Sequence, residues 1–186
     1  TKFKNVSLRS GNEIQIPEDW DFLEISDVCN TISGGTPLTS NPKYYNGTIP
    51  WLTSSELKDN FVTETKYHIT EDGLENSSAK KIPPDSTIIA MYGATIGKTC
   101  INTIEMTTNQ ACCIFTPKKE NSVDPYFLQQ LLIYFRPLIV SLAAGSGQPN
   151  ISQAFLKKFK MPFPSYLEQQ KIGSILASLD NKILVE

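Results

Sequence analysis

The spacing of apolar residues changes between residues 116 and 124 of this 186-residue chain, and this change most restricts its possible folds. Between about residues 82 and 116, β-branched residues are punctuated by Gly, Pro and Asn, which predicts a set of strands and turns. From Asp124 onward the apolar residues recur at every third or fourth position, as on the buried face of a helix. These residues are Phe127, Leu128, Leu131, Leu132, Phe135, Leu138, Ile139 and Leu142. We therefore predict an α/β (α+β) fold, a single globular domain with a mixed, strand-rich centre and helices.

The ends of the predicted helix carry recognisable signals. Asp124 is expected to cap it, with Pro125 at its first position. Pro137 is expected to kink or break it. A further short helix or turn is predicted within residues 151–159, after a loop rich in Gly, Pro and Asn.

A second helical stripe follows Pro162 and Pro164 at the end of the chain. Its apolar members are Leu167, Ile172, Ile175, Leu176, Leu179 and Ile183. Their spacing is that of a coiled-coil seam, and about 18 residues at 1.5 Å each would extend about 27 Å. Such a helix either packs on its own domain or protrudes to meet another helix.

Earlier segments predict short elements and tight loops. Residues 16–28 alternate in hydropathy, as in a strand or short helix, and a loop follows at Ser33–Pro37. Asn46-Gly47 predicts a turn before an apolar run. Thr53 to Glu56 could then cap a short helix.

One stretch, MYGATIGKTC at residues 91–100, imitates a nucleotide-binding motif. Gly93, Gly97, Lys98 and Thr99 resemble the phosphate loop G-x-x-x-x-G-K-[ST], but the two glycines are one residue too close. That loop also needs a helix after its lysine, so that the helix amides face the phosphates. A β-branched run follows here, so strand–turn–strand is predicted and ATP hydrolysis is not.

NPKYY at residues 41–45 imitates the N-P-P-Y loop of adenine methyltransferases, but Lys43 interrupts it. The sequence also lacks a glycine-rich strand-to-helix turn for S-adenosylmethionine, and a base pocket without its cofactor does no chemistry. We interpret this stretch as a proline-containing turn.

The chain shows no constellation for metal binding or catalysis. Cys29, Cys100, Cys112 and Cys113 make neither a disulfide framework nor a C-x-x-C pair, and His68 is the single histidine. No run of about 18 apolar residues, as a membrane span needs, and no secretory signal is visible. We expect a soluble protein of the reducing cytoplasm, without metal, cofactor or membrane partner.

Net charge is −2, which by itself does not indicate a nucleic-acid-binding protein. The charge is unevenly distributed, however. Residues 1–79 carry 6 basic and 12 acidic side chains, residues 80–119 carry 5 and 2, and residues 150–186 carry 5 and 3. The middle and the end of the chain are therefore basic relative to its first part.

Seven segments together resemble the specificity (S) subunits of type I restriction-modification systems, in order and in spacing. The resemblance extends from about Ile16 to Ile183. The segments are IPEDWDFLEISDV, SGGTP, YYNGTIPWLTSSEL, MYGATIGKT, TTNQACC, GSGQPNIS and FPSYLEQQKIGSILASLDNKI.

This resemblance implies a DNA target recognition domain over residues 1–164 and part of a conserved spacer or dimerisation helix over residues 165–186. In the family, two such domains are joined by two long antiparallel helices on which two methyltransferase (M) subunits dock. The M subunit methylates adenine, and the R subunit translocates and cuts DNA. The chain itself is expected to be non-catalytic and to bind double-stranded DNA, the M subunit and through it the R subunit. Because it holds one domain and one part-helix, it is a piece of a longer protein, a truncated product, or a half-subunit that pairs with a second copy.

The predicted contacts form two groups. The residues expected to contact DNA are polar and lie beside glycines or in basic segments; they are Lys43, Lys80, Lys81, Thr95, Lys98, Ser146, Gln148 and Asn150. The residues expected to contact a partner helix are Ile172, Ile175, Leu176, Leu179 and Ile183.

Base readout is expected elsewhere, in residues 54–80 and in the loop from Thr36 to Tyr45. Residues shared by proteins that read different sequences, such as Trp51 and Gly93, are expected to shape the fold instead. The alternative function is a protein-interaction module without nucleic acid, which would explain the terminal helix and the net acidity.

Overall fold

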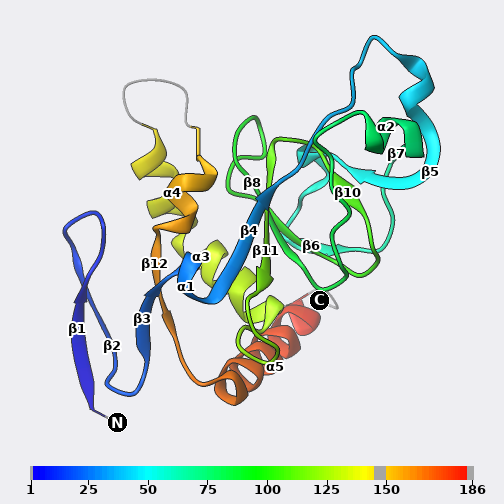
Figure 1. Ribbon diagram of the computed structural model, residues 1–186. Coiled ribbons are helices and arrows are strands. Elements are labelled where there is room, and N and C mark those ends of the chain that lie inside the picture. The colour runs from blue at the N-terminus through cyan, green and yellow to red at the C-terminus, as the bar shows by residue number, and fades with distance from the viewer. Residues whose placement is uncertain (1, 145–149, 184–186) are drawn as a thin grey trace.

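The computed structural model describes residues 2–144 and 150–183, and the side chains of these residues up to Leu179 (Figure 1). Strands and short helices dominate the first part, and two long helices lie in the last third. In chain order the elements are β1 (Phe3–Ser7), β2 (Glu13–Pro17), β3 (Asp21–Glu24), α1 (Ile25–Val28), β4 (Cys29–Ser33), the 3-10 helix η1 (Pro42–Tyr44), β5 (Tyr45–Leu52), the 3-10 helix η2 (Ser54–Glu56), β6 (Asn60–Val62), β7 (Tyr67–Ile69), α2 (Glu71–Glu75), β8 (Thr87–Ala90), β9 (Thr99–Asn102), β10 (Thr107–Thr108), β11 (Cys112–Pro117), α3 (Pro125–Ala143), α4 (Gln153–Lys157), β12 (Lys160–Phe163) and α5 (Tyr166–Ile183).

A five-stranded sheet with the order β4-β11-β8-β9-β6 lies at the centre. Its neighbouring strands are antiparallel, except that β6 and β9 run parallel. Helix α3 packs against β8 and β9 on one face. The opposite face packs on Leu52, Leu57 and Met106, which belong to the second, three-stranded sheet β10-β5-β7 and the segments around it. The predicted α/β (α+β) class with a strand-rich centre is confirmed.

Period-two alternation places neighbouring side chains of the central strands in two different cores. Ile89 and Cys113 lie in the core under α3, whereas Ile88 and Cys112 lie in the core on the other face. Because both faces are covered, the inner strands β8 and β11 are mostly apolar and almost wholly buried. The adjacent cysteines therefore pack in the protein interior on both sides of the sheet.

Helix α3 begins where the sequence predicts. The Asp124 side chain accepts a hydrogen bond from the Phe127 amide, and Pro125 occupies the first turn. The helix continues through Pro137 as one element, so it does not break there, and the expected kink stays a prediction. Proline removes one backbone donor, and burial of Phe135 and Ile139 on either side of it holds the helix together.

By length and composition α3 is apolar enough to cross a membrane, and about a third of it is buried. Its polar contacts link it to the central sheet instead. The Thr87 hydroxyl donates to the Pro125 carbonyl over 3.0 Å, and Arg136 pairs with Asp59 in the loop before β6. We interpret α3 as the core helix that covers one face of the sheet.

Two parts of the fold have no counterpart in the predicted elements. Strands β1 and β2 form a hairpin in register from Phe3 opposite Pro17 to Ser7 opposite Glu13, and it stands at one side of the molecule (Figure 1). The short helix predicted from Thr53 to Glu56 is present as η2, but residues 57–80, which contain β6, β7 and α2, have no predicted counterpart. These strands are only three residues long, so they are too short to show a hydropathy period.

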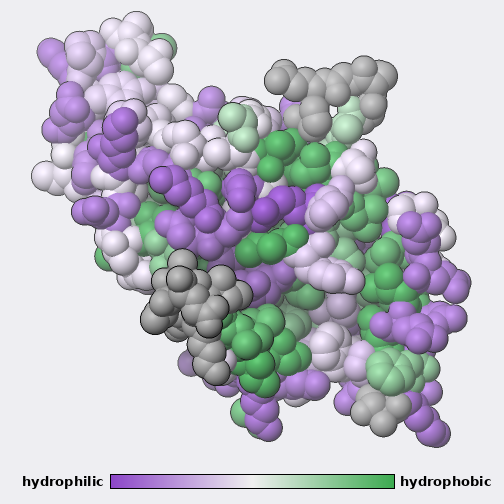
Figure 2. Space-filling view, turned by 180° about the vertical axis from the view of Figure 1, so that it is seen from behind, coloured by the Kyte–Doolittle hydropathy of each residue, from purple (hydrophilic) through white to green (hydrophobic). Residues whose placement is uncertain are grey.

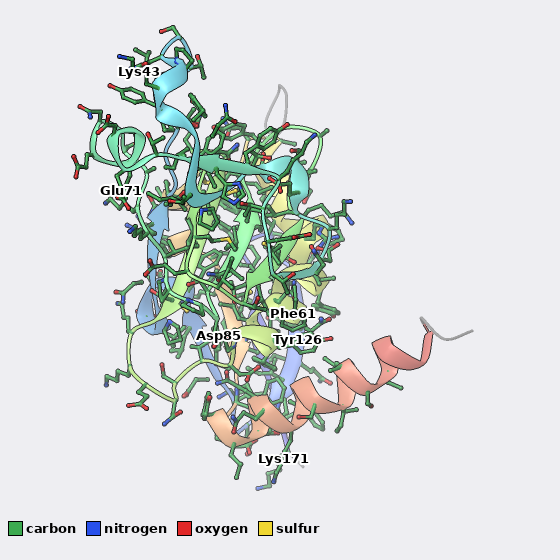
Figure 3. The ribbon with its side chains drawn as sticks, turned by 90° about the vertical axis from the view of Figure 1, so that its right-hand side faces the viewer. Lys43, Phe61, Glu71, Asp85, Tyr126 and Lys171 are labelled. Atoms are coloured by element: carbon green, nitrogen blue, oxygen red, sulfur yellow. The ribbon has the colours of Figure 1, made fainter. Side chains whose placement is uncertain are left out.

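Helix α5 is anchored by its first turns and then leaves the domain (Figure 3). The buried Gln169 side chain accepts from the Asp124 amide and donates to the carbonyls of Ser122 and Pro164. Ile172 packs against the core below α3. Ile175 and Leu179 are 61% and 48% exposed, and in the view from behind apolar side chains gather over the region of α5 (Figure 2).

Candidate nucleic-acid interface

Four loops that are distant in sequence meet at one end of the central sheet, which we call the loop end. They are Ser33–Pro37, Met91–Lys98, Asn109–Ala111 and Asn150–Gln153. Backbone hydrogen bonds join these loops. The Gly35 amide donates to the carbonyl of Thr108, the residue just before the third loop, over 2.9 Å. The Met91 amide donates to the Ala111 carbonyl over 2.7 Å, and the Ile151 amide donates to the Met91 carbonyl over 2.8 Å. The loop end is therefore a single surface with a fixed backbone.

Close packing at this surface explains the Gly34-Gly35 pair. A Cβ atom on Gly34 would lie 2.1 Å from the Thr108 hydroxyl oxygen, and one on Gly35 would lie 2.2 Å from the Ala79 amide nitrogen. The Gly35 carbonyl also accepts a hydrogen bond of 3.0 Å from the indole of the buried Trp51. Glycine is required here because backbones touch, and Trp51 serves the fold as expected.

The segment that imitates a phosphate loop is a turn between the antiparallel strands β8 and β9. Gly93 and Gly97 take φ values of 86° and 76°, which favour glycine, and no helix follows Lys98. The Thr95 hydroxyl donates to the Ser54 carbonyl over 2.8 Å. The predicted strand–turn–strand is confirmed, and the turn is tied to the segment that precedes β6.

An ion network centred on Asp59 holds this turn. Its carboxylate accepts hydrogen bonds from the Lys98 ammonium over 2.8 Å, from the Thr99 amide and hydroxyl over 3.0 Å each, and from the Arg136 guanidinium. Arg136 also donates to the Gly97 carbonyl over 2.8 Å. Asp59, Lys98 and Arg136 expose 19%, 45% and 22% of their side chains, so Lys98 is the member that solvent and ligands reach.

The network changes the titration of Asp59. Burial raises the pKa of its carboxyl, but hydrogen bonds from Lys98 and Thr99 and the charge of Arg136 outweigh burial and hold that pKa below its usual value. Since the folded-state pKa is depressed, the carboxylate stabilises the fold above the unfolded-state pKa of about 3.9, and this contribution is lost as pH falls through the folded-state pKa.

We therefore expect Asp59→Asn to lower the free energy of unfolding at pH 7 by about 2–3 kcal/mol, because it leaves two cations without a carboxylate. The difference from the unchanged chain should begin to shrink as pH falls below about 4, where Asp59 is protonated in the unfolded state, and should vanish below its lowered folded-state pKa, where it is protonated in both states. Urea unfolding at pH 7 and near pH 3 measures both values. The exposed Asp19→Asn serves as the control, and an equal cost of Asp59→Asn at both pH values would show that its charge is not the cause.

Polar side chains line the loop end and bond to one another. The Thr36 hydroxyl and the Gln110 side chain are hydrogen-bonded. Gln153 donates to the Thr31 carbonyl over 2.8 Å and accepts from the Ser33 hydroxyl over 3.2 Å. Hydroxyl and amide groups of this kind can exchange such bonds for bonds to base edges and phosphates.

Tyr92 adds a further hydroxyl to this surface. It lies beside Gln110, and burial raises the pKa of its phenol above the usual value. Tyr92, Gln110 and Gln153, like Asp59 and Arg136, were not among the predicted site residues. Their spacing in the sequence carries no signal that they meet.

The predicted DNA-contacting residues divide between this surface and others. Thr95 and Lys98 lie on the β8–β9 turn, and Asn150 is exposed at the loop end. Ser146 and Gln148 lie outside the described residues.

The three remaining predicted lysines do not belong to the four loops. Lys43 is exposed on η1 at the tip of the molecule, well away from α5 (Figure 3). Lys80 is exposed, and the Lys81 ammonium lies 3.7 Å from the Glu71 carboxylate. The structure thus brings Thr95, Lys98 and Asn150 to one end of the sheet, whereas Lys43 and Lys81 belong to the surface around η1 and α2. Lys80 follows Ala79, whose backbone packs against Gly35 of the loop end.

The described residues contain no group of three or more His, Cys, Asp or Glu side chains that could hold a metal ion. All four cysteines are buried. Burial raises the pKa of the Cys29 and Cys113 thiols to about 12, so both are protonated at neutral pH and are poor metal ligands and nucleophiles.

Comparison with known proteins identifies one family. The family model described as "Type I restriction modification DNA specificity domain" matches residues 17–186, so most of the β1–β2 hairpin precedes the match. The MjaIX specificity subunit of Methanocaldococcus jannaschii is 31% identical over 98% of this chain and 42% of its own length. The EcoR124I/EcoR124II specificity subunit of Escherichia coli is 28% identical over 86% of this chain and 41% of its own length. The chain thus spans less than half of the length of these relatives.

Solved structures share the fold. The HsdS subunit from Thermoanaerobacter tengcongensis superposes with a TM-score of 0.70 and 19% identity, over 91% of this chain and 39% of that one. A chain from a structural study of type I R-M system assembly and conformational transition superposes with a TM-score of 0.72 and 20% identity, over 91% and 40%. At these identities the likeness concerns the arrangement of strands and helices.

Proposed function

Because this chain belongs to the family of type I restriction-modification DNA specificity domains, we propose that it reads one half of a bipartite DNA site and positions a methyltransferase (M) subunit there. Residues 1–164 would be the target recognition domain. Residues 165–186 would belong to the spacer helix, in agreement with the end of β12 at Phe163 and the start of α5 at Tyr166. Its place of action would be the cytoplasm, with the R subunit recruited through the M subunit.

The observation that carries the proposal is the loop end. Four loops rich in Gly, Ser, Thr, Asn and Gln meet there on a fixed backbone, which suits contacts to phosphates and base edges. The opposite end of the central sheet suits DNA less well. A recess of about 500 Å³ there is lined by Phe61 and Tyr126 and by the acids Asp85, Glu120 and Asp124 (Figure 3). Those carboxylates repel a phosphate backbone, so DNA is expected at the loop end.

Helix α5 supports the second half of the proposal. Ile175 and Leu179 form an exposed apolar seam on a helix that extends beyond the domain. A monomeric domain gains nothing from this exposure, whereas a partner helix would bury both side chains. The seam would pair with a second copy of the chain or dock an M subunit. The alternative of an interaction module without nucleic acid explains the seam but leaves the loop end without a role.

The experiment that tests the proposal is DNA binding by the chain together with its M subunit. The binding is measured by fluorescence anisotropy with labelled duplexes, first of random and then of selected sequence. The logarithm of the association constant should fall linearly with the logarithm of the salt concentration. Selection from a random pool should return one defined half-site per domain. Absence of binding at low salt, with and without the M subunit, would overturn the proposal.

Lys98→Ala should weaken binding about evenly across sequences and reduce the salt slope by roughly one, because the lysine would contact a phosphate and not a base. Lys171→Ala, on α5 at the far end of the molecule, is the matched control and should leave the slope unchanged (Figure 3). Equal affinities of the Lys98 variant and the unchanged chain at every salt concentration would place Lys98 outside the interface.

A further inference from the structure

A basic recess lies where the hairpin tip meets α4 and β12. It has a volume of about 320 Å³ and is lined by Ser7, Leu8, Arg9, Glu24, Lys158 and Lys160. We infer that Arg9, Lys158 and Lys160, here called the hairpin patch, bind the phosphate backbone of duplex DNA next to the loop end. The inference rests on the proposed function and adds a contact surface on the β1–β2 hairpin and on the segment that joins α4 to β12.

Arg9 is held in place before any ligand arrives. Its guanidinium carbon lies 4.8 Å from the centre of the Phe155 ring, over the ring face. Leu8 packs against the core, and Gly11, with φ of 87°, closes the hairpin turn by donating to the Leu8 carbonyl over 2.9 Å. An ordered guanidinium loses little conformational freedom when it binds a phosphate.

The cations of the patch are available to a ligand. Among the described residues, no carboxylate lies within ion-pair distance of Arg9, Lys158 or Lys160. The other arginine of the chain, Arg136, is already committed to Asp59 and Gly97. Arg9 is therefore the arginine that is able to bind phosphate.

The recess is positive although the first part of the chain is acidic. Three cations face one carboxylate, Glu24, and that side chain already accepts from the Ser26 hydroxyl and caps α1. Lys157, the residue immediately before Lys158, is also exposed. Several cations around a recess with the Ser7 hydroxyl fit a ligand with regularly spaced negative charges, which is the chemistry of a nucleic-acid backbone.

Helix α4 connects the patch to the loop end. It starts at Gln153, whose side chain bonds to Thr31 and Ser33, and it is followed directly by Lys158. In Figure 1 it lies between the hairpin and the edge strand β4. Five helical residues span about 8 Å, which is less than one turn of duplex DNA. A duplex that rests on the loop end can therefore reach the hairpin patch with the same stretch of backbone.

The triple variant R9Q/K158Q/K160Q tests the inference by DNA anisotropy titrations over a range of salt. We expect the salt slope to fall by about 0.9 for each cation removed, so that raising salt from about 50 to 200 mM weakens the unchanged chain about 40-fold more than the variant. Preference for the selected half-site over a scrambled duplex should stay the same, because phosphate contacts do not read sequence.

The control K118Q/K119Q/K171Q removes the same charge from the end of the molecule that carries α5. Its slope should match that of the unchanged chain, because salt screens charges beyond about 10 Å. The double variant K158Q/K160Q keeps Arg9 on Phe155 and should show about two thirds of the slope reduction of the triple variant, which separates the charge effect from any local unfolding.

The outcomes separate the two hypotheses. Equal slopes for the triple variant and the control would overturn the hairpin patch while leaving DNA binding intact. A loss of half-site preference in the triple variant would also overturn it as a backbone contact. If the unchanged chain binds no DNA with its M subunit, the proposed function fails, and the hairpin patch fails with it.

Discussion

Replacing Ile175 and Leu179 together with aspartate is expected to abolish pairing of this chain through α5 and its docking to a partner helix. Ile175 and Leu179 are 61% and 48% exposed in the described part of the chain, and burying each in an interface is worth about 1.5–3 kcal/mol before ordering costs. Two charges placed in the same interface would cost more than this gain. The association constant should therefore fall by at least about 100-fold, which sedimentation velocity over the micromolar range would measure.

A matched control lies on the same helix. Ser174 and Ser178 are exposed one position before the two apolar residues, on an adjacent side of α5. Ser174→Asp with Ser178→Asp adds the same charge and should leave pairing nearly unchanged. The seam is not an interface if two results are found together. The unchanged chain would be a monomer in sedimentation, and the variant with aspartate at Ile175 and Leu179 would still assemble with the M subunit.

Pairing of identical chains has a consequence for the DNA. A two-fold symmetric pair presents two copies of one recognition domain, related by the symmetry axis. The half-sites selected by such a pair should therefore form an interrupted palindrome.

Adenine methylation is expected only when the M subunit is added to this chain. The stretch NPKYY departs from the N-P-P-Y loop of adenine methyltransferases at Lys43, and no glycine-rich strand-to-helix turn for S-adenosylmethionine is visible in the sequence. The chain would hold the M subunit next to the target base. The rate of methyl transfer at the selected site should therefore be at least about 100-fold higher than with the M subunit alone, because positioning of reactants is worth several kcal/mol. Transfer of radiolabel from S-adenosylmethionine to the duplex measures it.

The controls for methylation are the separate components and a scrambled duplex. The purified chain should transfer no label by itself, and the scrambled duplex should receive only background label from the assembled pair. Label transferred by the chain alone would contradict the proposal that it only supplies specificity.

Local patterns in the sequence determined much of the fold. The three-and-four spacing after Asp124, with its capping residue and Pro125, predicted α3 at its observed start. The β-branched run after Lys98 predicted a strand in place of the helix that a phosphate loop needs. These features depend on contacts within one turn or one strand, so a short window of sequence contains the information.

Only the tertiary structure decided how the pieces meet. Asp59 pairs with Arg136 across 77 positions, and this ion pair, together with Lys98, fixes the β8–β9 turn. Of the predicted partner-helix residues, Ile172 packs against the domain, Ile175 and Leu179 face solvent, and Leu176 is partly buried, whereas the side chain of Ile183 lies outside the described residues. The helical period is the same for all of them. Which side of a helix is covered, and which charges meet, depends on elements distant in sequence, and no local spacing encodes these contacts.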